Sequence, residues 1–281
     1  MKQGNITAKR IIGGIFTFLL TVLAAVLILL LSTAMSIFND RVVIQKLNES
    51  NYYNDIYSEL NKKAEELIAK AELPDSVLTK VITLERVYVD GKNYIEATLR
   101  GEEVPLQTQK LREQLSDNVD QYLKEQNLVI TDELSMGVAT IITELEELYR
   151  QGIELELMKY LHEYKLSFYR LMWVIIPVIL ALTVVLCYFI LQMNRYKHRG
   201  VRQISYATLS ASVMAILSAG YLLLAKPYRR LEIAPDYYSD FLHHYFDWSS
   251  KGLLYMGFMG ILVTVILIAL VNYMKNRIGS R

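Results

Sequence analysis

Cysteine is almost absent from this 281-residue sequence, and its one example, Cys187, lies within an apolar run. The chain therefore holds no disulfide framework, and any folded domain in it depends on its hydrophobic core. The sequence also contains no glycine-rich phosphate loop, no Gly-x-Ser-x-Gly elbow and no paired-cysteine metal knuckle. These absences argue against nucleotide binding, serine hydrolysis and a zinc-knuckle fold.

Charged side chains and histidine are missing from four long windows, which are residues 11–39, 171–194, 203–225 and 252–274. Each window exceeds the roughly 20 residues that cross about 30 Å of hydrocarbon as a helix. Backbone polar groups inside lipid must bond within their own segment, so the windows predict four transmembrane helices. Proton relays, ion sites and voltage sensors need charged groups within the membrane, so the sequence argues against a pump or secondary transporter.

The fold class that follows is an all-α integral membrane protein with a large, mainly helical extracytoplasmic domain between its first two spans. The spans are assigned to residues 11–38, 170–194, 203–225 and 252–274. The domain occupies residues 39–169, and a smaller outer loop occupies residues 226–251. A tail at 1–10, a loop at 195–202 and a tail at 275–281 are assigned to the cytoplasm.

This orientation rests on three short segments that carry lysine and arginine without aspartate or glutamate, a distribution typical of the cytoplasmic side. Their basic residues are Lys2, Lys9 and Arg10, then Arg195, Lys197, Arg199 and Arg202, then Lys275, Arg277 and Arg281. Both termini are therefore expected inside, in what we interpret as a bacterial plasma membrane. The first apolar run is longer than the about 7–15 residues of a signal-peptide core, so we expect an uncleaved anchor.

The insert is strongly acidic, although the whole chain has a formal net charge of only +1. Residues 39–166 hold 25 of the 29 acidic and 15 of the 30 basic residues, a net charge of about −10. Binding to nucleic acid derives its affinity from lysine and arginine on phosphates, so nucleic acid is not an expected partner. The carboxylates at positions 144, 146, 147, 154 and 156 are interpreted as a solvated helix face.

Several helices are expected within the insert. Ser50-Asn51 begins one that runs to about Ala71, with an apolar face that includes Ile56 and Leu60. Residues 83–100 permit two interpretations. A continuous apolar stripe favours a helix, whereas strand-like stretches around Asp90-Gly91 fit a β-hairpin at 86–98 with a type I′ turn.

The last helix of the insert is predicted to begin at Thr131, where Asp132 and Glu133 suit its positive end. Its apolar stripe continues to Tyr164 without a proline before Pro177, which favours one long rod that enters the second span. The alternative is a break near Gln151-Gly152. A continuous rod would couple movement of the domain to the membrane.

Small residues spaced four apart predict close helix packing in the membrane, where dispersion contacts replace the hydrophobic effect. The first span contributes such residues, the third is the richest in them, and the fourth carries two glycines. We therefore place the third span in the middle of the bundle. The residues are Gly13, Thr17 and Thr21, then Ala207, Ala211, Ala215 and Ala219, then Gly257 and Gly260.

Residues 235–249, between the third and fourth spans, form the most unusual short segment. One helical face would carry Tyr238, Phe241, Leu242, Tyr245 and Phe246, which fits an amphipathic helix lying in the membrane interface. Near the opposite face, two Asp/His pairs are spaced four apart, and imidazole and carboxylate ligands suit zinc, manganese or iron. These candidate ligands are Asp240, His243, His244 and Asp247. We favour the interface helix, because one short helix rarely supplies a closed ligand set.

The order of spans, outer domain and outer loop resembles that of FtsX and the MacB-type permeases. The resemblance covers the whole chain as topology, with no shared motif, and implies a permease-type subunit of an ATP-driven envelope complex. From the residues themselves we favour a non-enzymatic membrane protein whose outer domain binds a protein partner or envelope component. A third interpretation is an extracytoplasmic metal-dependent enzyme. Membrane lipid is an expected partner, and no cofactor is expected.

Overall fold

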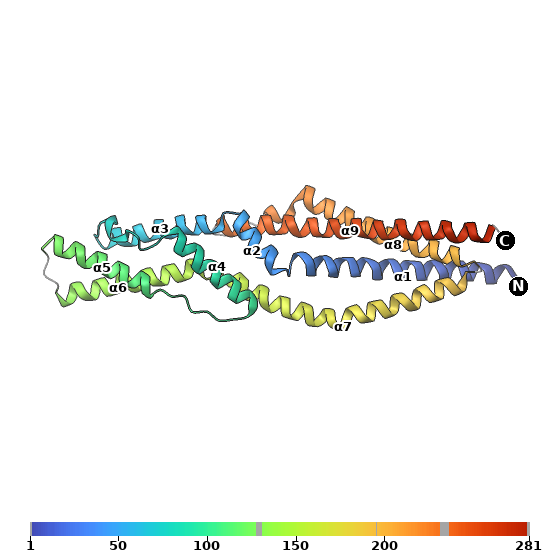
Figure 1. Ribbon diagram of the computed structural model, residues 1–281, viewed down its shortest axis with the longest axis horizontal. Coiled ribbons are helices and arrows are strands. Elements are labelled where there is room, and N and C mark those ends of the chain that lie inside the picture. Colours follow the sequence, from blue (N-terminus) through green and yellow to red (C-terminus); the bar gives the residue numbers. More distant parts are fainter. Residues whose placement is uncertain (1, 128–130, 195, 231–235, 280–281) are drawn as a thin grey trace. The chain divides into compact units, whose positions relative to one another are not determined.

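The computed structural model describes residues 2–127, 131–194, 196–230 and 236–279 (Figure 1). These residues form helices and connecting loops and contain no β-strand. Four of the described helices are long and apolar enough to cross a membrane, as the sequence predicted. Arg195, Pro235 and Arg281, which figure in the sequence interpretation, lie outside the described residues.

The chain divides into two compact units. The apolar unit comprises Met1–Asn39, Lys165–Leu231 and Tyr245–Arg281, and the charged unit comprises Asp40–Tyr164 and Glu232–His244. Two helices supply residues to both units: α7, Glu156–Met193, and α9, Asp236–Gly279. The apolar unit also contains α1 (Lys2–Ser36), α8 (Lys197–Ala225) and the short η2 (Pro227–Arg230). The charged unit also contains α2 (Asp40–Glu49), α3 (Tyr52–Lys70), η1 (Asp75–Leu78), α4 (Leu84–Arg100), α5 (Gln109–Glu125) and α6 (Asp132–Ile153).

Small residues on α8 allow close packing in the apolar unit. Ala211, Ala215 and Ala219 are buried in one cluster with Ile28 of α1 and Leu253 of α9. A second cluster joins Leu20, Ile190 and Ala207. Of the four helices long and apolar enough to cross a membrane, the one containing α8 has the largest buried share.

The two glycines of α9 meet α8 closely. A Cβ atom built on Gly260 would lie 3.2 Å from Cβ of Ser212, and one built on Gly257 would lie 2.6 Å from Cγ1 of Ile216. On α1, Gly13 is buried near Gln203, and the Thr17 hydroxyl donates to the Gly13 carbonyl at 2.8 Å. Thr21 donates in the same way to the carbonyl of Thr17 at 3.0 Å, so both threonines satisfy their hydroxyls within their own helix.

Residues 84–100 form a helix, and the alternative β-hairpin is wrong. The Thr83 side chain accepts a hydrogen bond from the Arg86 backbone N–H at the start of α4, and Gly101 ends the helix in the left-handed conformation with φ of 78°. Gly91 falls mid-helix rather than in a turn. A Cβ atom there would lie 3.0 Å from the Tyr53 ring, so this glycine serves the close approach of α3 rather than a hairpin turn.

The predicted rod from Thr131 into the second span is interrupted. Helix α6 ends at Ile153 and α7 begins at Glu156, two residues beyond the break that the sequence offered as an alternative. Gly152 lies against Leu60 of α3, where a Cβ atom would be 2.6 Å from Cδ2 of that leucine. Ile153 and Leu155 are both buried, so the break between the two helices lies within the core of the charged unit.

Candidate functional site

The aromatic segment between the third and fourth spans is helical, but it is the first part of α9 and is continuous with the fourth span. In the charged unit its apolar face covers Tyr52 of α3. The Tyr52 ring centroid lies 5.6 Å from that of Tyr237 and 6.3 Å from those of Tyr238 and Phe241. Phe241 is only 1% exposed, so protein side chains cover it.

The two remaining aromatic residues of that predicted face lie in the apolar unit. The Tyr245 hydroxyl donates to the backbone carbonyl of Ile37, just after α1. The Phe246 ring lies 5.6 Å from the ring of Tyr228 in η2. This half of the segment therefore packs among the ends of α1 and α8.

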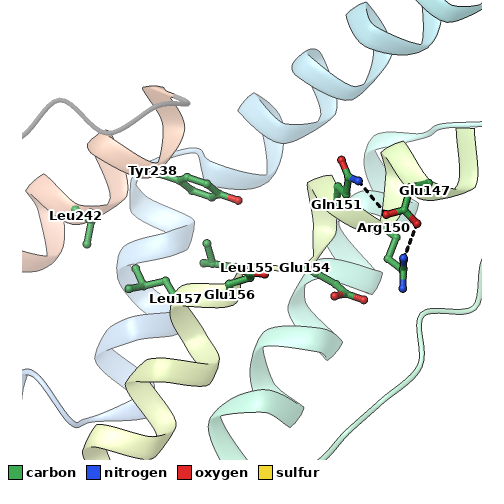
Figure 2. A pocket seen from close by; sticks show the side chains of 9 residues that line it. All are labelled: Glu147, Arg150, Gln151, Glu154, Leu155, Glu156, Leu157, Tyr238 and Leu242. Atoms are coloured by element: carbon green, nitrogen blue, oxygen red, sulfur yellow. Dashed lines mark hydrogen bonds and ion pairs between the residues drawn. The ribbon is translucent and has the colours of Figure 1, made fainter. Parts of the chain in front are cut away.

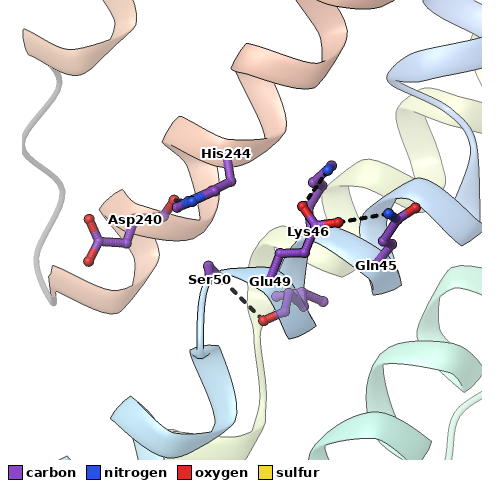
Figure 3. Close-up of polar contacts among 7 residues, drawn as sticks. Gln45, Lys46, Glu49, Ser50, Asp240 and His244 are labelled. Atoms are coloured by element: carbon purple, nitrogen blue, oxygen red, sulfur yellow. Dashed lines mark hydrogen bonds and ion pairs between the residues drawn. The ribbon is translucent and has the colours of Figure 1, made fainter.

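Two of the four candidate metal ligands, His244 and Asp247, make contacts of another kind. The His244 ring donates from Nδ1 to the Asp240 backbone oxygen at 2.9 Å (Figure 3). The Asp247 carboxylate accepts a hydrogen bond from the Tyr228 hydroxyl. It also lies 3.8 Å from Lys226 and 3.7 Å from Arg229. Throughout the part of the chain that the structure describes, no group of three His, Cys, Asp or Glu side chains is arranged to hold a metal ion.

A polar contact on α2 lies near this segment within the charged unit. Lys46 donates to Oε2 of Glu49 at 2.5 Å, and Gln45 donates to Oε1 at 2.7 Å (Figure 3). These hydrogen bonds, that of Lys46 foremost, hold the pKa of the Glu49 carboxyl below its usual value, with a small contribution from His244. Glu49 is thus a carboxylate that stabilises a buried lysine, rather than a proton donor near neutral pH.

Tyr52 and Tyr53 begin α3 as buried phenols. Neither hydroxyl has a hydrogen-bond partner among the described residues, and burial raises the pKa of both. Neutral phenols in an apolar setting cannot act as bases near neutral pH. Tyr52 packs under the first turns of α9, and Tyr53 packs against Tyr88 of α4.

A cleft of the charged unit lies where α6 ends and α7 begins, and we call it the junction cleft (Figure 2). Its volume is about 630 Å³. Leu155, Leu157 and Leu242 give it an apolar surface, and Tyr238 projects from α9 toward it. Its polar residues are Glu147, Arg150, Gln151, Glu154 and Glu156.

Acidic groups outnumber basic ones around the junction cleft. Arg150 and Gln151 both donate to Glu147, at 2.5 Å and 2.9 Å, so the one arginine is already paired. Glu154 lies 3.9 Å from Lys159 outside the lining, a loose ion pair. Glu156 is exposed, and within the described residues no lysine or arginine lies at ion-pair distance from it. The cleft therefore presents negative potential beside leucine side chains.

The described lining of the cleft combines leucine side chains with carboxylates and contains no serine, threonine, cysteine or histidine. Apolar side chains with a few polar groups are the usual composition of a site that holds a ligand. Sequence reasoning treated Glu147, Glu154 and Glu156 as a solvated face. The break near Gln151-Gly152 was the one signal that could have located the cleft.

A smaller hollow of about 360 Å³ lies between the start of α3 and the start of α4. Tyr53 and Tyr88 line it, with ring centroids 5.0 Å apart, and three exposed asparagines surround it. The asparagines are Asn48, Asn51 and Asn54. This hollow is less acidic than the junction cleft, because Glu85 is its one charged lining residue.

Comparisons with protein-family models, with curated proteins and with solved structures find no match to this chain.

Proposed function

We propose that this protein is a non-enzymatic, multi-pass membrane protein whose charged unit binds a basic segment of another protein at the junction cleft. The observation that carries the proposal is the lining of that cleft, in which three carboxylates and one paired arginine surround leucine side chains. A lysine or arginine side chain complements this surface, because its cationic head meets the carboxylates and its aliphatic stem covers the leucines.

The charged unit is proposed to lie outside the cytoplasm, with both termini inside, in a bacterial plasma membrane. Support comes from the lysine and arginine residues in the short segments that flank the spans. A reporter fused after Arg199 should be active only in the cytoplasm, whereas reporters at Lys92 and Tyr238 should be active only outside. A cytoplasmic reporter at Lys92 would refute this orientation.

Photo-crosslinking tests the binding site. A photoreactive amino acid at Leu157, which lines the cleft and is 39% exposed, should give a discrete protein adduct in the cells that make the chain. The same group at Met136, which is 65% exposed on α6 and outside the lining, should give none. Adducts of equal yield at both positions would contradict a specific site.

Charge reversal then tests the proposed chemistry of the partner. Glu154→Lys combined with Glu156→Lys should abolish the adduct at Leu157, because two carboxylates of the cleft become cations. Glu144→Lys provides the control, since Glu144 is exposed on α6 and does not line the cleft. An adduct that survives the double reversal would show that the partner segment is not basic.

A permease-type subunit of an ATP-driven complex is the second candidate. The observation in its favour is that α7 and α9 each supply residues to both units, so a state of the charged unit has a helical path into the spans. This candidate requires an ATPase partner, and binding of a basic segment alone does not. Copurification from membranes in mild detergent distinguishes them, because a stoichiometric ATPase is expected only for the permease-type subunit.

A further inference from the structure

The apolar unit contains a groove of about 450 Å³ that α1, α8, η2 and α9 enclose. Its walls are mostly apolar, with Leu29, Leu222, Phe246 and Leu253 among the lining residues, and Ser32 and Ser249 add hydroxyls. We call it the η2 groove. Next to these lining residues in the chain, α1 and α9 meet closely, because a Cβ atom on Gly252 would lie 2.9 Å from Cβ of Ser36.

One end of the η2 groove is basic. The helix η2 and the residue before it carry Lys226, Arg229 and Arg230, and Tyr228 between them lines the groove. Asp247 is the carboxylate that approaches them, at 3.8 Å from Lys226 and 3.7 Å from Arg229. The carboxylate also accepts a hydrogen bond from the Tyr228 hydroxyl, so its charge is divided between that hydrogen bond and two loose ion pairs. Among the described side chains, Lys226 and Arg229 lie near one carboxylate and Arg230 follows in the chain, which leaves this end of the groove with a net positive charge.

Apolar walls alone would not select an occupant in a bilayer, because lipid tails are as apolar as leucine side chains. The charged end decides the class of occupant. A basic site beside a groove between membrane helices attracts an anionic lipid headgroup. The Asp247 carboxylate repels such a headgroup, but it offsets the attraction of the neighbouring cations only in part. A free phosphate ion would meet the cations but leave the apolar groove unfilled. A zwitterionic lipid would fill the groove but gain little net attraction.

We propose that the η2 groove binds one phospholipid with a net negative headgroup, with its phosphate beside Lys226 and Arg229 and an acyl chain along Leu222 and Leu253. This site is independent of the junction cleft and of the orientation of the charged unit. It would anchor η2, and with it the end of α8 and residues 246–253 of α9, to anionic lipid.

Native mass spectrometry of the full chain tests the proposal, with phosphatidylglycerol and phosphatidylcholine added separately at equal concentration. One tightly retained phosphatidylglycerol is expected, and phosphatidylcholine should bind at least about tenfold more weakly. Equal retention of the two lipids would overturn the proposal. Glycerol phosphate, which carries the phosphate without acyl chains, should not bind detectably, and its binding would point to an anion site instead.

Variants of the basic end separate charge from structure. Lys226→Ala with Arg229→Ala should weaken phosphatidylglycerol binding about tenfold or more. Arg199→Ala with Arg202→Ala removes two exposed cations at the opposite end of α8 and should leave binding unchanged. Asp247→Asn should strengthen binding, because it removes the competing carboxylate. A loss of binding in Asp247→Asn, or unchanged binding in the first variant, would overturn the proposal.

A groove-filling variant provides a second, independent measurement. Leu222→Trp should exclude the acyl chain and abolish retention of phosphatidylglycerol. Leu217→Trp is the matched control, since Leu217 lies on the same helix, is 68% exposed and does not line the groove. Retained binding in Leu222→Trp would place the lipid elsewhere. The charge variants above decide the question if this substitution disturbs folding.

Discussion

At the residue scale, two buried tyrosines of the charged unit differ in whether the hydroxyl group has a hydrogen-bond partner. The Tyr149 hydroxyl donates to Oδ2 of Asp90 at 2.7 Å and so joins α6 to α4. Tyr52 is equally buried, yet its hydroxyl has no partner among the described residues. A buried polar group without a partner costs free energy that a matched pair recovers. The two tyrosines should therefore respond in opposite directions to the same substitution.

Tyr149→Phe should lower the stability of the charged unit, because it removes the hydrogen bond to Asp90 and leaves that carboxylate without its donor. The expected loss is about 1–3 kcal/mol. Tyr52→Phe should leave stability unchanged or raise it, since it deletes a hydroxyl that makes no hydrogen bond. Thermal unfolding of the full chain in detergent, followed by far-ultraviolet circular dichroism, measures both. A loss of similar size in the two variants would contradict the assignment.

Glu49 should make stability depend on pH in the acid range. Its pKa in the folded chain is held below the ordinary value of 4.5, chiefly by the hydrogen bond from Lys46. A carboxyl with a lowered folded pKa stabilises the fold above its unfolded pKa, and this contribution is lost as pH falls through the folded pKa. Stability attributable to Glu49 should therefore be full at neutral pH and decline below pH 4.5.

Glu49→Gln tests this pH dependence. The variant should be less stable than the parent at neutral pH, and the difference should shrink as pH falls below 4.5. Because Lys46 is only 7% exposed, its ammonium group would lose the charged partner that compensates its burial. Glu59→Gln is the control, because Glu59 pairs with Lys63 on the surface at 3.2 Å with both side chains more than one third exposed. Equal effects at the two positions would refute a special role for Glu49.

At the element scale, glycines in one helix serve different purposes. Gly152 of α6 lies against Leu60 of α3, which is only 2% exposed and has little room to move. Gly137 lies in the same helix, is exposed, and has no atom within 4 Å of an added Cβ. The first glycine therefore permits contact between two helices, and the second only weakens its own helix.

Gly152→Ala should destabilise the charged unit by about 1–3 kcal/mol, because the added methyl group overpacks the α3–α6 contact. Gly137→Ala should stabilise it by up to about 1 kcal/mol, since alanine favours the helix and meets nothing. Urea unfolding of the two variants provides the comparison. Stabilisation by both substitutions would show that α3 and α6 are not in close contact.

At the scale of the whole molecule, the charged unit is assembled from two segments of the chain. Residues 40–164 form most of it, and the start of α9 completes it by covering Tyr52. The isolated main segment would expose that aromatic surface. Its stability should therefore depend on a segment that follows two membrane-length helices in the sequence.

A fragment of residues 40–164 should be helical but should melt at a lower temperature than the same fragment joined to residues 236–244 by a flexible linker. Burial of Phe241 alone contributes about 1.5–3 kcal/mol. In the joined fragment, Phe241→Ser should remove most of the increase in melting temperature, whereas His243→Ala should leave that increase in place. Equal melting temperatures with and without residues 236–244 would contradict the division into units.

Local chemistry in the sequence determined the helical class, the four helices long and apolar enough to cross a membrane, and several helix boundaries. Apolar windows located these four helices because each window is a property of adjacent residues, and Thr83 and Thr131 cap α4 and α6 through contacts within three residues. For residues 83–100 the continuous apolar stripe in the sequence favoured the correct helix. The Asp90-Gly91 turn signal misled because the closeness of Tyr53, which accounts for Gly91, is a tertiary contact.

Only the tertiary structure decided where helix faces meet. The junction cleft joins residues 147–157 to Tyr238 and Leu242, and the cover of Tyr52 joins α3 to α9. Periodicity shows which face of a helix is apolar, but it does not identify the partner face, because many pairings bury similar area. The same reason explains why the sequence did not predict the neighbours of Asp247. Its spacing from His243 suggested a shared metal, whereas packing placed it beside Tyr228 and Arg229.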